Sequence, residues 1–250
     1  MNKTIENRLP AWIGEFAQSK GRYAVCNIPG LSKMDIAGAL QKTGFNPAST
    51  WDGEVTDVVS GEDETDRGKN TNTFPFHTDG VYYSEPPHYV ILYCVSTSGT
   101  GGETFFTPSA DVLETIRKEF NQNLLDSINV VYMERERRRY RHPLIEMIGT
   151  DEVLRWSSAL YLEPDVSKIS EPNRKRATLL IPALMTRIND SMREHVCYEH
   201  TWKPGDLLIF NNRQLVHGRT QVCDPQRERH LYRALFSDSE EENTFAPMMS

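Results

Sequence analysis

The amino-acid sequence predicts a mainly β fold with helical additions, built on a sandwich or jelly-roll core. Many short runs rich in β-forming residues are separated by Gly and Pro turn signals, and only a few segments show helical spacing of apolar residues. The 250 residues, of which 38% are hydrophobic and 25% charged, can bury a sizeable core. We therefore expect residues 1–250 to form a single domain.

Four segments have the apolar spacing of amphipathic helices. The second of them begins after Ser32, a residue type that often caps a helix N-terminus, and the third begins at a Pro-Ser pair. The expected helices cover residues 5–18, 33–43, 109–120 and 171–194.

The expected strands are short runs of β-branched, aromatic and other apolar residues between turn signals. They are Tyr23–Ile28, His88–Ser96, Glu103–Thr107, Val130–Arg141, Val153–Leu162, Cys197–Trp202, Leu207–Asn211 and Arg229–Phe236. The segment 52–73 is polar and acidic, and it reads as a long loop of the kind that often closes over a binding site. Acidic residues of this lid loop, such as Asp57, could receive an ammonium group.

Composition narrows the classes of partner. The net charge of -7 argues against a nucleic-acid-binding surface. No stretch is long and apolar enough for a membrane span, and the first residues lack the apolar centre of a signal peptide, so we expect a soluble, cytoplasmic protein. The four cysteines form no CxxC pair, which argues against a zinc knuckle. A small-molecule substrate is the expected partner, and a homo-oligomer stays open.

His77 and Asp79 stand two residues apart in the segment FPFHTDG. In a strand, residues i and i+2 face the same side, about 6.6 Å apart, so both side chains could converge on one ion. Two histidines and one carboxylate, with other positions left open, are the ligand set of oxygen-activating Fe(II). The HxD pattern also occurs by chance, so the spacing alone leaves a metal site and a coincidence both open.

A third ligand has to come from elsewhere in the chain, and His217 is the best candidate. It follows the segment WKPGDLLIFNNRQLV, which we interpret as a turn, a buried strand and a second turn. Gly218 comes next, and a glycine there allows the backbone to approach a ligand closely. A lone histidine is more often a surface residue or a hydrogen-bonded core residue, and that alternative also stays open here.

The last expected strand carries two arginines on an apolar face. Alternation with period two places Arg229, Leu231, Arg233 and Leu235 on the same side. A buried guanidinium without a partner is costly, and a bidentate carboxylate ligand would satisfy it. Pairing with Asp or Glu near the strand ends would satisfy it equally, and the residues alone leave both alternatives open.

Four segments together resemble the superfamily of taurine dioxygenase (TauD/TfdA) and clavaminate synthase, which are Fe(II)/2-oxoglutarate oxygenases. The segments are FPFHTDGVYYSEPPHYVILYC, GTGGETFF, WKPGDLLIFNNRQLVHGRT and RERHLYRALF, and the match extends from about Tyr23 to Phe236. Their order, spacing and flanking residues all agree with the family pattern. The resemblance implies a double-stranded β-helix core of the jelly-roll, cupin-like type.

The resemblance also implies roles for individual residues. His77, Asp79 and His217 match the iron ligands of the family. Thr104 and Arg229 match the positions that bind 2-oxoglutarate, with the arginine on its C5 carboxylate. Arg233 matches a position that often contacts an acidic group of the main substrate. Because the loop before the two arginines varies in length, Arg229 and Arg233 could exchange roles.

Other residues, within and outside the four matching segments, have weaker assignments. Tyr82, Tyr83 and Trp156 are candidates for the substrate pocket, with positions in the core as the alternative. Asn211, Asn212 and Arg213 match a turn that usually braces the distal histidine, and we expect purely structural roles for them. No metal role is expected for His88, His142, His195, His200 and His230.

The implied reaction uses O2 and 2-oxoglutarate, releases succinate and CO2, and hydroxylates an unactivated C–H bond of a small molecule that bears a carboxylate, such as an amino acid or a derivative. Asp79 argues against halogenation, because related halogenases have a small residue at this position. Desaturation or cyclisation with the same iron chemistry is the alternative reaction. A non-catalytic jelly-roll protein that binds a ligand is the alternative of another class.

Overall fold

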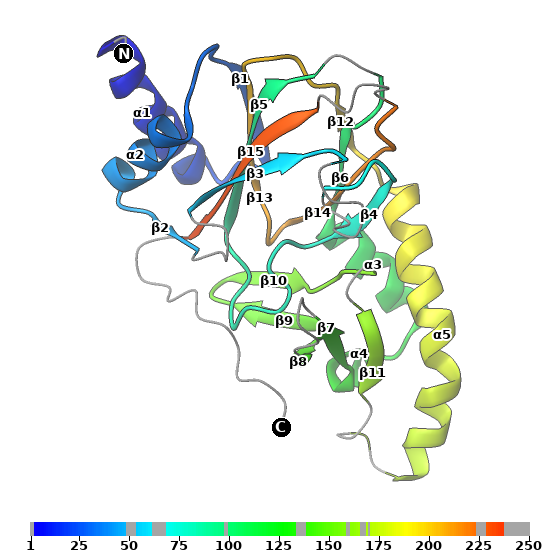
Figure 1. Ribbon diagram of the computed structural model, residues 1–250. Helices are drawn as coiled ribbons and strands as arrows, with labels where there is room; N and C mark the ends of the chain where they lie inside the picture. The colour runs from blue at the N-terminus through cyan, green and yellow to red at the C-terminus, as the bar shows by residue number, and fades with distance from the viewer. Residues whose placement is uncertain are drawn as a thin grey trace.

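Two antiparallel β-sheets lie at the centre of the molecule, with helices on the outer side of the larger sheet and along one flank (Figure 1). This arrangement confirms the mainly β fold with helical additions. The structure is a computed structural model. It describes residues 3–48, 54–61, 69–97, 100–133, 139–158, 161–165, 169, 171–223 and 229–237.

The larger sheet has six strands in the order β1-β13-β5-β15-β2, and β3 also pairs with β15. Side chains alternate between its two faces. In β13, Leu207 and Ile209 face one apolar core, whereas Leu208 and Phe210 face another. The strands are β1 (Tyr23–Asn27), β13 (Asp206–Asn211), β5 (Tyr89–Ser96), β15 (His230–Ser237), β2 (Asn46–Pro47) and β3 (Val55–Val59).

The smaller sheet has four strands in the order β12-β6-β14-β4. It packs against the inner face of the larger sheet, because Phe106 and Leu215 of the smaller sheet share one buried cluster with Leu208 and Leu231 of the larger. A core between two facing sheets is the arrangement of a jelly roll. The strands are β12 (Tyr198–His200), β6 (Thr104–Pro108), β14 (Leu215–Arg219) and β4 (Phe74–His77).

The helices α1 (Lys3–Ser19) and α2 (Lys33–Thr43) cover the outer face of the larger sheet. They bury Leu9 and Ile36 in the same cluster as Ile209 of β13. Ser32 caps α2 as expected, since its hydroxyl accepts a hydrogen bond from the Asp35 N–H in a capping box.

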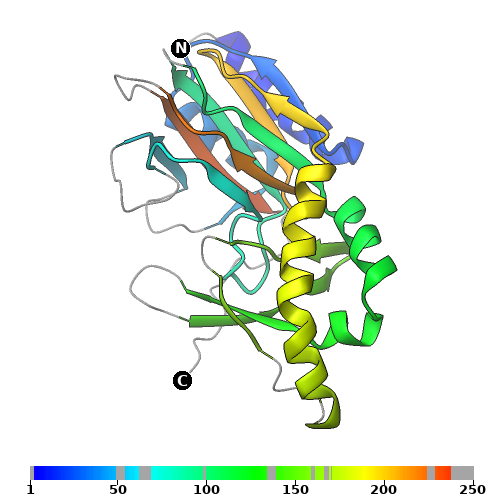
Figure 2. The same cartoon turned by 90° about the vertical axis from the view of Figure 1, so that its right-hand side faces the viewer.

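The lower part of the molecule holds two small sheets and three helices (Figure 2). The strands β9 (Ile145–Ile148) and β10 (Asp151–Leu154) form a hairpin, and β7 (Asn129–Met133) pairs with both β8 (Arg139–Pro143) and β11 (Tyr161–Asp165). The long helix α5 (Glu171–Glu194) and the helix α3 (Ser109–Glu119) pack over one apolar cluster, and α4 (Gln122–Ser127) adds Leu125 to it.

Three expectations about strands were wrong. The run Val130–Arg141 is not one strand but two, β7 and β8, which pair with each other. The run Val153–Leu162 is divided between β10, which ends at Leu154, and β11, which begins at Tyr161. Neither run is uniformly strand-forming: residues 134–138 of the first are all charged, and the second contains Ser157 and Ser158. His217, expected after a turn, lies inside strand β14.

The expected lid loop at 52–73 was also wrong in part. Val55–Val59 forms strand β3 and pairs with β15, so this portion belongs to the sheet. Residues 62–68 lie outside the described residues, and a lid role for them stays a prediction.

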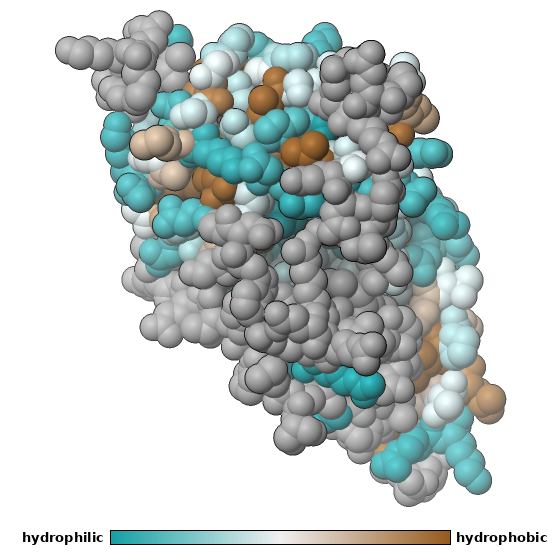
Figure 3. Space-filling model, in the orientation of Figure 1, coloured by the Kyte–Doolittle hydropathy of each residue, from teal (hydrophilic) through white to brown (hydrophobic). Residues whose placement is uncertain are grey.

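The face in Figure 3 mixes hydrophilic and hydrophobic residues. None of the helices within the described ranges has the length and apolar character needed to cross a membrane.

Candidate metal centre

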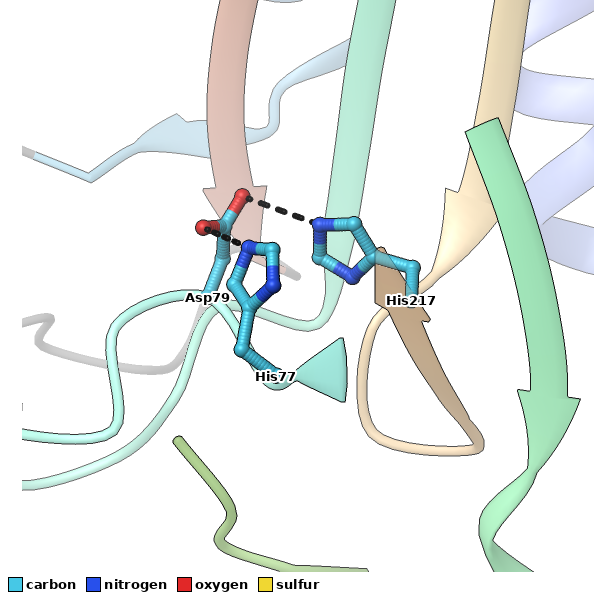
Figure 4. Close-up of side chains that lie close together, drawn as sticks. All are labelled: His77, Asp79 and His217. Atoms are coloured by element: carbon cyan, nitrogen blue, oxygen red, sulfur yellow. Dashed lines mark ion pairs between the residues drawn. The ribbon is translucent and has the colours of Figure 1, made fainter. Parts of the chain in front are cut away.

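The side chains of His77, Asp79 and His217 converge between β4 and β14 (Figure 4). His77 is the last residue of β4, and the antiparallel register places it directly opposite His217 on β14. Asp79 lies in the turn just beyond β4, so the expectation that it shares a strand face with His77 was wrong. The turn, rather than strand alternation, directs its carboxylate towards the two imidazoles.

The three side chains are close enough to share one ion. The Nε2 atom of His77 lies 3.5 Å from Asp79 Oδ1, and the Nε2 atom of His217 lies 3.8 Å from Asp79 Oδ2. One potential ligand atom of each residue lies within 4.8 Å of the others, and all three residues are buried. Among the described residues, no other group of three His, Cys, Asp or Glu side chains comes together in this way.

The electrostatics of the cluster favour the protonation states that a metal requires. Burial by itself would raise the pKa of Asp79, but the Arg233 guanidinium and the two histidines outweigh it and hold that pKa well below its usual range. Burial, aided by the neighbouring His77, lowers the pKa of His217 well below its usual value. A divalent ion binds an ionised carboxylate and neutral imidazoles, so the donor set fits such an ion.

A hydrogen bond to the backbone fixes the orientation of the His77 ring. Its Nδ1 atom lies 3.0 Å from the carbonyl oxygen of Pro75. Because a carbonyl can only accept, Nδ1 carries a proton, and Nε2 is the nitrogen that faces the cluster and would bind a metal. Next to His217, a Cβ atom added to Gly218 would lie 2.4 Å from the Phe105 ring, so this glycine makes room for a neighbouring side chain.

The cluster lies in the wall of a cavity of about 690 Å³, part of which is open to solvent. The larger sheet contributes β3, β5 and β15, the smaller sheet contributes β4, β6 and β14, and the segment before β4 adds Lys69. The lining residues are Thr56, Asp57, Val58, Lys69, Phe74, His77, Asp79, Leu92, Thr104, His217, Gly218, Arg219, Arg229, Leu231 and Arg233.

Arg229 is a buried cation that forms no ion pair with any of the described residues. It is only 3% exposed, and its Nε and Nη1 atoms are buried with no hydrogen-bond partner among the described residues. Burial, together with the charge of Arg219, lowers its pKa to about 9. A buried guanidinium of this kind calls for a carboxylate partner, and the cavity beside it is where such a ligand would lie.

The expected alternation along β15 is confirmed, because Arg229, Leu231 and Arg233 all line the cavity. The two arginines differ in their surroundings. The Nη1 atom of Arg233 lies 3.4 Å from Asp79 Oδ1, and its side chain is 31% exposed. For Arg233, the alternative of an acidic partner within the protein is therefore the one observed.

Thr104, the other expected cosubstrate residue, is buried at the start of β6 and lines the same cavity. Its hydroxyl oxygen accepts a hydrogen bond from the indole N–H of Trp202, at 3.1 Å. The structure thus brings Thr104, Arg229 and the His–Asp–His cluster to one cavity, although they are spread over more than half of the chain.

The three aromatic candidates for the substrate pocket lie elsewhere. Tyr83 and Trp156 are buried in apolar clusters, and Tyr82 packs against these clusters. None of the three is among the residues that line the cavity. Their positions favour the core alternative, and a role in substrate binding stays a prediction.

Asp57 was expected to face a ligand from the lid. The residue does line the cavity, and its carboxylate pairs with Lys33 and with the Nε2 atom of His230. The other acidic residues of that segment, Glu62, Asp63, Glu64 and Asp66, lie outside the described residues.

Several cavity residues were not anticipated from the sequence. Arg219 is 5% exposed, and its Nη2 atom donates to the carbonyl oxygens of Asn70 and Asn72. Its position two residues after His217 on one strand was the available signal. Thr56 and Val58 were missed because their segment was taken for a loop.

Together, the facing sheets, the His–Asp–His cluster and the buried arginine define a non-haem iron oxygenase of the 2-oxoglutarate-dependent class. Within that class, the chain belongs to the family described as "Taurine catabolism dioxygenase TauD, TfdA family", whose model matches residues 31–235.

Similar proteins were found by sequence and by structure. The 3-((Z)-2-isocyanoethenyl)-1H-indole synthase of Fischerella ambigua is 23% identical over 72% of this chain and 69% of its own. A tyrosine isonitrile desaturase of Erwinia amylovora is 27% identical over 72% of this chain. The aligned part covers only 65% of that protein. The crystal structure of PvcB from Pseudomonas aeruginosa has a TM-score of 0.68 at 19% identity and covers 98% of this chain and 85% of its own. This last likeness shows the fold.

Proposed function

We propose that the protein is an Fe(II)- and 2-oxoglutarate-dependent oxygenase that hydroxylates an unactivated C–H bond of a small, carboxylate-bearing molecule, an amino acid or a derivative of one. The observation that carries this proposal is the convergence of His77, Asp79 and His217 in one cavity with Arg229, whose buried Nε and Nη1 atoms have no hydrogen-bond partner among the described residues. A metal cluster alone fits many functions, whereas a metal cluster with a buried carboxylate-binding cation fits this cosubstrate.

His77, Asp79 and His217 would hold the iron and leave other coordination positions open. Iron, 2-oxoglutarate and O2 supply the oxidising chemistry when bound, with release of succinate and CO2, and the protein supplies binding and orientation. The Pro75 carbonyl keeps the His77 proton on Nδ1. The low pKa of Asp79 keeps its carboxylate ionised for the metal.

Arg229 and Thr104 would bind 2-oxoglutarate. Arg229 offers two buried N–H donors to the C5 carboxylate, and the low local polarity strengthens such a pair. Thr104 donates its hydroxyl proton to a carboxylate oxygen, since the Trp202 indole already occupies an acceptor site on its oxygen. The two residues lie on facing sheets, so the cosubstrate would span the space between them.

Arg233 would bind the carboxylate of the main substrate. It lies on β15, four residues beyond Arg229, which directly precedes the strand. Both residues line the cavity, and Arg233 is the more exposed of the two. Its guanidinium pairs with Asp79. A bound divalent cation neutralises that carboxylate, which leaves the Arg233 guanidinium available to a second anion.

Desaturation is a second candidate, and one observation favours it. Two relatives are named for products or reactions of isonitrile chemistry, a tyrosine isonitrile desaturase and an isocyanoethenyl-indole synthase. The same cluster could remove two hydrogens from adjacent carbons of an amino-acid derivative instead of adding oxygen to one of them.

One experiment tests both candidates. Free amino acids and N-substituted derivatives, isonitriles included, would be incubated with the protein, Fe(II), 2-oxoglutarate and O2. Substrate-dependent succinate together with a product that gains one oxygen atom supports hydroxylation, and a product that loses two hydrogens supports desaturation. His217→Ala is the control and should form no product. If no compound stimulates succinate formation and His217→Ala binds Mn²⁺ as tightly as the wild type, the oxygenase proposal is wrong.

A further inference from the structure

Asn212 makes three hydrogen bonds to the backbone beside the metal cluster. It lies in the turn between β13 and β14 and is 1% exposed. Its Oδ1 atom accepts from the backbone N–H of Asp79 at 2.9 Å. Its Nδ2 atom donates to the carbonyl oxygen of Asp79 at 3.0 Å and to that of Pro87 at 2.9 Å. The side-chain amide of Asn212 therefore forms hydrogen bonds with both the backbone N–H and the backbone C=O of Asp79.

Asp79 requires such a partner because the sheet ends before it. Strand β4 stops at His77, so the buried N–H and C=O of Asp79 have no neighbouring strand. Thr78, the residue between His77 and Asp79, is held by other partners. Its N–H donates to the Trp156 carbonyl oxygen, and its hydroxyl donates to the Leu154 carbonyl oxygen. The backbone is thus fixed at each residue from His77 to Asp79.

Asn212 also joins the two halves of the cluster. It stands five residues before His217, on the connection that leads into β14, and its own N–H donates to the His88 carbonyl oxygen at 2.8 Å. The resemblance suggested a turn that braces the distal histidine. The observed side-chain bonds of Asn212 go to Asp79 and Pro87 instead.

We propose that Asn212 is the positioning residue that sets the Asp79 carboxylate against His217 in the metal site. This inference rests on the proposed metal role of Asp79. Metal affinity depends on ligands held in place before the ion arrives, because a turn that can relax has to be reordered on binding. Asn212 supplies this order without contacting the ion.

The choice of asparagine follows from the bonds. An acceptor and two N–H donors on one short planar group are needed, and only a primary amide offers them. An aspartate would lose both donors, and a glutamine would be one methylene too long. The neighbouring Asn211 has other partners, since its Oδ1 atom accepts from the N–H groups of Arg213 and Gln214.

The test is the affinity of the metal-free protein for Mn²⁺, measured by calorimetry without O2 in Asn212→Ala and in the wild type. We expect roughly 10- to 100-fold weaker binding, the usual effect of losing a partner that orients a metal ligand. Thr107→Val is the matched control. It removes a different buried hydrogen bond, from the Thr107 hydroxyl to the Met192 carbonyl, and should lower the melting temperature without changing Mn²⁺ affinity.

Asp79→Ala separates failure of this inference from failure of the proposed function. If Asp79→Ala leaves Mn²⁺ binding intact, the metal site itself is wrong. If Asp79→Ala weakens binding but Asn212→Ala does not, or if Thr107→Val weakens it equally, the positioning role is wrong. In the Asp79→Ala background, Asn212→Ala should weaken Mn²⁺ binding no further; a full additional loss would also overturn the inference.

Discussion

The indole nitrogen of Trp202 donates a hydrogen bond to the hydroxyl oxygen of Thr104, 3.1 Å away in the buried wall of the cavity. The two residues are 98 positions apart in the chain. An indole can only donate, so the Thr104 oxygen is the acceptor, and the threonine proton is free to turn towards the cavity. An anionic oxygen bound there would meet a donor already in place.

Trp202→Phe tests this arrangement. The phenylalanine retains most of the apolar surface but removes the donor, so the Thr104 hydroxyl can turn away from the ligand. We expect 2-oxoglutarate to bind roughly fivefold more weakly, equivalent to about 1 kcal/mol. Titration of the Mn²⁺-loaded protein with 2-oxoglutarate measures this affinity. The control variant Trp12→Phe, in α1 and away from the cavity, should bind 2-oxoglutarate normally. An equal loss of affinity in Trp12→Phe would contradict a specific role for Trp202.

Gly102→Ala should disturb the cosubstrate site through Arg229. A Cβ atom at Gly102 would lie 2.7 Å from Arg229 Cδ and 2.9 Å from its Nε, so the guanidinium would have to move. Gly102 also has a φ of +79°, a conformation that costs energy with any side chain. We expect lower stability and weaker 2-oxoglutarate binding. Gly149→Ala, at a φ of +59° with nothing near the added atom, should lower stability alone.

Arg229→Ala should abolish tight 2-oxoglutarate binding. The lost partner would leave a buried carboxylate unpaired at a cost of about 3–5 kcal/mol, a loss of more than roughly a hundredfold in affinity. Arg229→Lys should recover part of this loss, because it keeps the charge but not the two-pronged geometry. Should Arg229→Ala bind 2-oxoglutarate normally while Arg233→Ala does not, the two arginines have exchanged roles.

The sequence revealed those parts of the site that have a local pattern. Alternation placed Arg229 and Arg233 on one face, and the cavity lining agrees. The geometry expected for His77 and Asp79 was wrong, although their side chains do converge. Hydrogen bonds between residues far apart in the chain have no local sequence pattern. Asn212 and Asp79, for example, are 133 positions apart. Strand β3 was missed for a different reason: its sequence VTDVV is rich in β-branched residues, but the acidic and Gly-containing residues around it made the whole segment resemble a loop.

His142 should make stability depend on pH. Burial, and next the charge of Arg155, lower its pKa from 6.5 to about 4. Between these values the unfolded chain binds a proton that the folded protein does not, so the free energy of unfolding falls as pH drops from 6.5 towards 4, by about 3 kcal/mol at most. Urea unfolding with chelator at pH 7.5 and 5 measures this. His142→Gln should show a smaller difference; an unchanged difference would contradict the assignment.

The last prediction concerns Arg233, whose role depends on whether the metal is bound. Its Nη1 atom lies 3.4 Å from Asp79 Oδ1, so the guanidinium and the carboxylate balance each other's charge. Asp79 would share its charge with a metal that it helps to hold, and Arg229 would bind the C5 carboxylate of 2-oxoglutarate. A second anion, supplied by the main substrate, is then required for Arg233.

Arg233→Gln separates this role from a role at the metal. With the substrate that the amino-acid screen identifies, we expect loss of substrate-dependent succinate formation and at least a tenfold higher KM, while the affinities for Mn²⁺ and 2-oxoglutarate at neutral pH stay within roughly twofold of the wild type. Restored turnover in Arg233→Lys would show that charge is the property required. If Arg233→Gln loses Mn²⁺ affinity to the same extent as it loses turnover, the guanidinium serves Asp79 rather than the substrate. Normal turnover, or a substrate without an acidic group, would contradict the prediction outright.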